Sequence, residues 1–216
     1  MGEADLRVIE SAPLSYVLSV PPGAGEGKRP VLCFLHGYDE AAPTEIRAGV
    51  TRHGPLRPGS SPRATADFIV VAPQLPAAGD LWHRHADAVA RIVADVREEH
   101  GGDERRTYLS GFSFGGNGVF DLALAQPDTW AALWAVDPTR VPRTDPRRPV
   151  WLSFGQVARH GKAAFIRALD LQPAGEAPSG DRLHLDEGED HVGSATRAYR
   201  DERVYAWLLS HRLAAR

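Results

Sequence analysis

The sequence predicts an α/β fold, with a mostly parallel central sheet and helices on both of its faces. Two observations support this prediction. Short apolar runs of strand length alternate with segments whose apolar residues recur at helical spacing, almost throughout the chain. At one strand-to-helix junction, residues 108–118, the chain carries the pattern G-x-S-x-G around Ser113. Alternating strands and helices favour a parallel sheet, because parallel neighbours need a crossover connection that a helix supplies.

Length and charge limit the classes of function. The 216 residues fit a single domain over 1–216, which can bury a real core but is short for an enzyme with a separate lid domain. The formal net charge of -3 gives no general attraction to nucleic acid, so no nucleic-acid partner is expected. The start of the chain does not read as a secretory leader, and no apolar run approaches the ~20 residues of a membrane span. We therefore expect a cytoplasmic protein.

The first strands follow from apolar runs. Residues 14–20 mix apolar, aromatic and β-branched side chains, which predicts a strand near a sheet edge. Continuous apolar runs at 31–35 and 68–72 predict central strands buried on both faces. The first of these runs contains Cys33, the only cysteine of the chain, which excludes an internal disulfide and indicates a buried core residue. The intervening segment 38–66 is rich in Gly, Pro, Arg and Ser, and its length suggests a wall of a binding site.

The remaining elements continue the alternation. Apolar residues from Trp82 to Val96 recur at helical spacing and predict an amphipathic helix that ends near residue 100. Further strands are expected at 107–110, 131–136, 150–155 and 182–185, and helices at 44–49, 119–124, 163–171 and, as one long terminal helix, 195–213.

Ser113 is the first candidate functional residue. A serine hydroxyl is a weak nucleophile unless a base and amide donors lie beside it, and a tight turn from strand to helix presents it to both. Gly111 and Gly115 lie two residues to either side, where side chains would collide as the backbone reverses. The alternative interpretation is a serine that only caps the following helix.

Several motifs occur in an order that is typical of one superfamily. They are Leu35-His36-Gly37, His53-Gly54-Pro55, the segment 71–76, the serine motif at 108–118, and the closing segments 198–201 and 205–209. With them the chain resembles the α/β-hydrolase superfamily, and within it the compact esterases grouped with feruloyl esterases, polyhydroxybutyrate depolymerases and predicted peptidases. The resemblance runs from about Val31 to the C-terminus and implies a minimal α/β-hydrolase fold.

The resemblance also implies an active site. It assigns Ser113 as nucleophile, His191 as base, and the backbone N–H groups of Phe114 and Tyr38 as the oxyanion hole. His191 follows the last predicted strand in a glycine-containing loop, as the catalytic histidine of the superfamily does. Two alternatives remain, namely a solvated loop histidine and a His36-Gly37 dipeptide that only turns the chain.

The acid of the triad departs from the pattern of the superfamily. Ala158 occupies the position where relatives usually carry an aspartate. Asp137 is our first choice as replacement, because it ends the strand after the nucleophile helix, a position that some lipases use. The alternatives are a carboxylate close to His191 in the sequence, or a site without an acid. These neighbouring carboxylates are Asp186, Glu187 and Asp190.

Together these residues predict a serine hydrolase that acts on a small-molecule carboxylic ester and needs no cofactor. A peptidase or thioesterase would use the same residues, and Ala158 also motivates a binding protein without turnover. No metal is expected, because His83 and His85 are two residues apart and would point to different faces of a helix. Trp82, with Tyr38 and Phe114, is expected to line an apolar substrate pocket.

Overall fold

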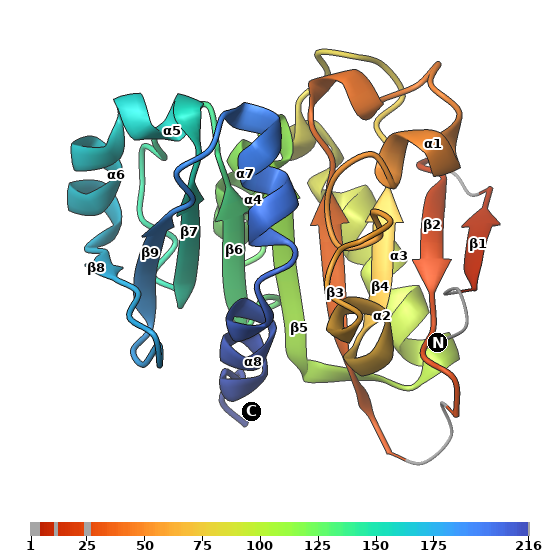
Figure 1. The fold of residues 1–216 in the computed structure, drawn as a ribbon. Helices are drawn as coiled ribbons and strands as arrows, with labels where there is room; N and C mark the ends of the chain where they lie inside the picture. The colour runs from red at the N-terminus through yellow and green to blue at the C-terminus, as the bar shows by residue number, and fades with distance from the viewer. Residues whose placement is uncertain (1–4, 11–12, 24–26, 216) are drawn as a thin grey trace.

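The continuous apolar runs form the centre of a single sheet (Figure 1). The computed structural model describes residues 5–10, 13–23 and 27–215, and within them nine strands pair in the order β1-β2-β4-β3-β5-β6-β7-β9-β8. The strands are β1 (Leu6–Ile9), β2 (Tyr16–Ser19), β3 (Arg29–Leu35), β4 (Ile69–Pro73), β5 (Gly102–Phe112), β6 (Ala132–Val136), β7 (Val150–Phe154), β8 (Gln172–Pro173) and β9 (Arg182–Asp186). Among the strand pairs of the described residues, only β1–β2 and β2–β4 are antiparallel, which confirms the mostly parallel sheet.

Helices cover both faces of this sheet, as predicted. They are η1 (Tyr38–Glu40), α1 (Ile46–Val50), α2 (Arg63–Asp67), η2 (Trp82–His85), α3 (Ala86–His100), α4 (Phe114–Ala125), α5 (Gln156–His160), α6 (Lys162–Leu169), α7 (His191–Ala198) and α8 (Glu202–Ser210). In Figure 1, α1, α2, α7 and α8 lie in front of the sheet and α3 and α4 behind it. The two faces have separate apolar cores, because side chains alternate along each strand: Cys33 packs in one core and Phe34 in the other.

The parallel strands bring the candidate site residues to one edge of the sheet. Leu35 of β3 pairs with Gly111 of β5, and Phe112 of β5 pairs with Val136 of β6. The loops that leave the carboxyl ends of these strands therefore start side by side. In open α/β sheets such an edge is the usual place for a ligand.

The terminal helix is a correction to the sequence analysis. The predicted single helix over 195–213 is wrong, since α7 ends at Ala198 and α8 begins at Glu202. Asp201 makes the break, because its side chain accepts a hydrogen bond from the Arg203 N–H and starts a new helix. The short strands β1 and β8 and the short helices η1, α2 and α5 were not predicted either. Among the described residues, no helix has the length and apolar character needed to cross a membrane.

Candidate active site

The turn between β5 and α4 holds Ser113 in a strained conformation. Its backbone has φ 57° and ψ -115°, in a region that residues other than glycine rarely adopt. A Cβ on Gly115 would lie 1.9 Å from the Leu35 carbonyl oxygen, and one on Gly111 would lie 2.3 Å from the Gly115 oxygen. Both positions therefore need glycine, as the G-x-S-x-G pattern suggested. Ser113 stands at the N-cap of α4, but its side chain makes no capping hydrogen bond.

A chain of hydrogen bonds joins the three residues that the sequence suggested as catalytic. Ser113 Oγ lies 2.9 Å from His191 Nε2, and His191 Nδ1 lies 2.6 Å from Asp137 Oδ2. Because Nδ1 faces a carboxylate, it carries the ring proton in the neutral imidazole, and Nε2 accepts from the serine hydroxyl. Ser113 is 7% exposed, and the imidazole is open enough for a small molecule to reach the pair.

Asp137 is held by backbone donors as well as by His191. It is 0% exposed, and its carboxylate accepts hydrogen bonds from the N–H groups of Gly155 (2.9 Å), Val157 (3.2 Å) and Ala158 (2.7 Å). These three N–H groups and the His191 ring compensate the cost of burying the carboxylate. Ala158, which replaces the expected aspartate, therefore contributes its N–H to the carboxylate that lies next to His191.

The carboxylates near His191 in sequence are engaged elsewhere. Asp186 accepts from the Arg159 guanidinium at 2.7 Å, and this arginine lowers the pKa of Asp186 to about 2. Asp190 accepts from the Gly193 N–H at 2.7 Å and caps α7. Glu187 is buried, and burial raises its pKa to about 7. The carboxylate that hydrogen-bonds His191 Nδ1 belongs to Asp137, which is far from His191 in the sequence.

Two helix starts present amide groups beside Ser113. Phe114 is the first residue of α4 and Tyr38 is the first of η1, so neither N–H has an acceptor within its own helix. In the part of the chain that the structure describes, neither N–H donates a turn, loop or cap hydrogen bond. The two rings meet edge to face, with centroids 5.2 Å apart, and Tyr38 is 47% exposed. The Tyr38 ring is thus positioned at the surface of the site.

His36 and Trp82 support the segment before Tyr38. His36 Nε2 accepts from the Leu75 N–H at 3.0 Å, and its Nδ1–H donates to the Gly37 oxygen at 2.6 Å. Burial lowers the pKa of His36 to about 4, so the ring is neutral at pH 7. The Trp82 indole donates to the His36 oxygen at 3.2 Å. Trp82 is only 2% exposed, so it offers a substrate no more than one edge, and substrate contact by Trp82 stays a prediction.

Sequence reasoning missed a pair next to Ser113, the buried Glu40 and the half-buried His53. A Cβ added at Gly37 would lie 2.7 Å from Glu40 Oε2 and 3.4 Å from Ser113 Cβ, which places the carboxyl group close to the serine. Glu40 Oε1 is 3.4 Å from His53 Nε2. The His53 ring packs on Phe112, and Phe112 packs on His191. The available signal was a glutamate three residues after Gly37, together with the His53-Gly54 motif.

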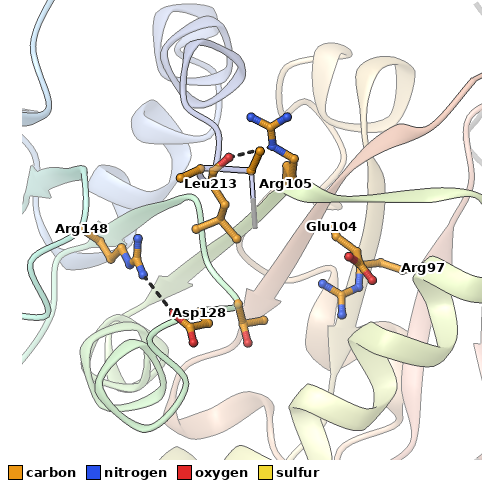
Figure 2. Close-up of a pocket in the computed structure, with 9 residues that line it drawn as sticks. Arg97, Glu104, Arg105, Asp128, Arg148 and Leu213 are labelled. Atoms are coloured by element: carbon orange, nitrogen blue, oxygen red, sulfur yellow. Dashed lines mark hydrogen bonds and ion pairs between the residues drawn. The ribbon is translucent and has the colours of Figure 1, made fainter.

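Two pockets lie at opposite ends of the sheet. One, of about 540 Å³, is lined by Phe114, the residue that follows Ser113. The other, of about 510 Å³ and shown in Figure 2, is lined by residues at the amino ends of β5, β6 and β7. There Arg105 Nε donates to the Leu213 oxygen at 2.8 Å, and Arg148 pairs with Asp128 at 3.9 Å. The pocket beside Phe114 therefore lies at the same end of the sheet as Ser113.

No metal centre accompanies this site in the described residues, where no group of three His, Cys, Asp or Glu side chains could hold an ion. The two histidines of the H-x-H motif do not share a site. His85 bonds Asp80 at 2.7 Å, while His83 lines the pocket beside Phe114.

Comparison with known proteins identifies the fold. A thermostable esterase superposes with TM-score 0.74 at 19% identity, over 97% of this chain and 63% of that one, so this chain spans less than two thirds of its length. An S-formylglutathione hydrolase from Agrobacterium tumefaciens gives TM-score 0.63 at 15% identity, over 97% and 95% of the two chains. A structure from work on two fungal esterases from Rhizomucor miehei gives TM-score 0.68 at 15% identity, over 95% of this chain and 82% of that one.

At these identities the similarity defines the fold and leaves the activity open. The chain has the α/β-hydrolase fold, as its motifs suggested. A scan against known protein families finds no matching family model.

Proposed function

We propose that this protein is a serine hydrolase that cleaves a carboxylic ester through an acyl-enzyme intermediate. One observation carries the proposal, namely the hydrogen-bonded series Ser113 Oγ, His191 Nε2, His191 Nδ1 and Asp137 Oδ2, with distances of 2.9 and 2.6 Å. It is the arrangement that acyl transfer to serine requires, with a base within reach of the hydroxyl and an acid behind the base. The three structural neighbours, which are described as esterases and a hydrolase, support the same class.

Acylation begins when His191 Nε2 takes the proton of the Ser113 hydroxyl and Oγ attacks the ester carbonyl carbon. The tetrahedral intermediate carries its negative charge on the former carbonyl oxygen, and the amides of Phe114 and Tyr38 donate hydrogen bonds to it. When the intermediate collapses, the bond to the alcohol oxygen breaks. His191 returns its proton to that oxygen, and the alcohol leaves.

Deacylation repeats the same steps with water. His191 Nε2 takes a proton from water as the water oxygen attacks the acyl carbon, and the bond to Ser113 Oγ then breaks. Ser113 recovers its proton from His191, and a carboxylic acid is released. Throughout, Asp137 keeps the Nδ1 proton in place and stabilises the imidazolium.

Labelling of the nucleophile tests this proposal. We expect a fluorophosphonate probe to modify Ser113 in the purified protein, and p-nitrophenyl acetate and butyrate to be hydrolysed. Both signals should disappear in Ser113→Ala and persist in Ser179→Ala, since Ser179 is exposed and far along the chain. Wild type without labelling at Ser113, and with turnover no faster than Ser113→Ala, would exclude a serine hydrolase.

A further inference from the structure

The pocket beside Phe114 is lined by both apolar and charged side chains. Its volume is about 540 Å³, and it lies between η2, α4 and the loop that follows β6. Leu81, Phe114 and the edge of Trp82 provide the apolar surface. The loop that follows β6 adds the charged side chains Arg140 and Arg143 to its wall. A ligand that fills this pocket would therefore present an apolar chain and a polar end.

The pocket extends away from the nucleophile along α4. Asn117 and Asp121, which line it, are four and eight residues beyond Ser113. With a rise of ~1.5 Å per residue, they lie ~6 and ~12 Å from the serine along the helix axis. A group bound at this wall would thus belong to the same substrate molecule as the ester, several bonds away from its carbonyl carbon.

Arg140 is held in place on this wall. Its Nη2 donates to both carboxylate oxygens of Asp121, at 2.9 and 2.7 Å. The backbone around it is fixed by Asn117, whose Oδ1 accepts from the N–H groups of Thr139 and Arg140 at 3.0 Å each. Asn117 Nδ2 also donates to Thr139 Oγ1 at 2.7 Å. One nitrogen of the guanidinium serves Asp121, so its other donors are open to a ligand.

The charge of the wall is positive. Asp121 balances Arg140, but Arg143 is exposed and makes no hydrogen bond or ion pair with any described residue. His83, at the same rim, has no such partner within the described residues either. The whole chain has a formal charge of -3, so a positive wall beside the nucleophile opposes the overall charge. A fixed arginine beside an unpaired one is suited to a carboxylate.

From this arrangement we infer that the pocket binds an anionic tail, and that the substrate is an ester whose apolar chain ends in a carboxylate, such as the half-ester of a medium-chain dicarboxylic acid. This inference rests on the proposed serine hydrolase. It specifies the chemical group at the end of the substrate that lies away from the ester. Hydrolysis itself proceeds as above, and Arg140 and Arg143 contact the tail only.

Matched esters test the tail on either side of the scissile bond. On the acyl side, mono-p-nitrophenyl suberate is compared with p-nitrophenyl octanoate. On the alcohol side, the acetate ester of ω-hydroxyoctanoate is compared with octyl acetate by titrating the released acid. The ratio of kcat/KM for the charged ester to that for the uncharged one reports recognition of the tail and cancels general effects on catalysis.

In wild type we expect this ratio to exceed one in at least one of the two arms. Arg143→Gln should lower it by about fivefold, as expected for loss of a partly exposed ion pair. Arg143→Glu should bring it below one. Arg147→Gln, which removes an exposed arginine of the same loop outside the pocket, is the matched control and should leave the ratio as in wild type. High salt should reduce the ratio as well.

Failure of the inference differs from failure of the proposed function. If the uncharged esters are hydrolysed and both Arg143 variants keep the wild-type ratio in both arms, the anionic tail is overturned and the serine hydrolase stands. If wild type hydrolyses none of the four esters and the fluorophosphonate does not label Ser113, both proposals fall.

Discussion

Asp137 and Glu40 are two buried carboxyl groups that flank Ser113, each with a histidine beside it, yet their surroundings differ. Asp137 is 0% exposed and accepts three backbone N–H groups, and its Oδ2 is 2.6 Å from His191. Glu40 is 4% exposed, its Oε1 is 3.4 Å from His53, and no hydrogen bond of normal geometry reaches its Oε2 from the described residues.

Burial alone therefore does not identify the acid of a triad. Donors stabilise a buried carboxylate, whereas a buried carboxyl group without donors favours its neutral form. Burial raises the pKa of Glu40 against the opposing effect of Arg52, and burial also lowers the pKa of His53 to about 4, aided by Arg52, Arg57 and His191. Burial therefore disfavours the charged form of both Glu40 and His53, which lie beside the segment that leads to Tyr38.

The largest predicted effect is on Asp137. Asp137→Asn keeps the shape but offers His191 Nδ1 a donor or a weaker acceptor, so kcat on p-nitrophenyl butyrate should fall by about 10⁴. The control is Asp186→Asn, which removes a carboxylate close to His191 that pairs with Arg159, and it should retain most of the activity. Full activity of Asp137→Asn combined with an inactive Asp186→Asn would reverse the assignment.

Glu187, a third buried carboxyl group, tests the role of burial through stability. Its pKa is raised from 4.5 to about 7 in the folded state, so it stabilises the fold fully below pH ~4.5, and that stability is lost as pH rises through ~7. On going from pH 4.5 to pH 8.5, the free energy of unfolding of Glu187→Gln should rise by about 3 kcal/mol relative to that of wild type. Urea unfolding at the two pH values measures this difference. The control is Glu189→Gln, on a half-exposed side chain of the same loop that pairs with Arg197, and it should show no such change.

His36 extends the test to a histidine of the Tyr38 segment. Its pKa is lowered from 6.5 to about 4 by burial, so its contribution to stability is present above pH ~6.5 and is lost as pH falls toward ~4. His36→Asn should reduce the difference in unfolding free energy between pH 7.5 and pH 5.0 by about 2 kcal/mol. An unchanged difference would mean that His36 titrates alike in the folded and unfolded chain.

The smallest effect is expected for Glu40→Gln. Because burial disfavours the charged carboxylate, the amide should replace it with little change, and kcat on p-nitrophenyl butyrate at pH 7 should stay within about threefold of wild type, a change in activation free energy below ~1 kcal/mol. Glu40→Ala, which empties the space beside Gly37, should reduce kcat further because the segment that carries Tyr38 loses its support. A loss of the size predicted for Asp137→Asn would show an ionised Glu40 and break the comparison.

The sequence correctly predicted those elements that are determined by residues close together in the chain. Continuous apolar runs located β3, β4 and β6, and the two glycines around Ser113 located the turn, because clashes within a few residues decide both. The strand β1 was missed because it is short and half exposed, without an apolar alternation. The break at Asp201 was missed because apolar residues continue at helical spacing on both sides of it.

Contacts between distant segments set the rest. Asp137 was only one of several carboxylates in the sequence, since its neighbours depend on how β6 lies beside β7 and how the first turn of α5 points its N–H groups. Glu40 went unnoticed because its burial depends on Gly37, Gly49 and His53 packing around it. The sequence shows which residue types are present, but their hydrogen-bond partners can be assigned only from the folded structure.

The positive φ of Ser113 has a consequence for how this protein tolerates change. A residue other than glycine in such a conformation costs about 1–3 kcal/mol, so Ser113 destabilises the fold that holds it. Ser113→Gly, which also lacks the hydroxyl, should therefore have a free energy of unfolding about 1 kcal/mol higher than that of Ser113→Ala, as measured by urea unfolding. Selection for stability alone would replace this serine, and its retention would need selection on what the hydroxyl does.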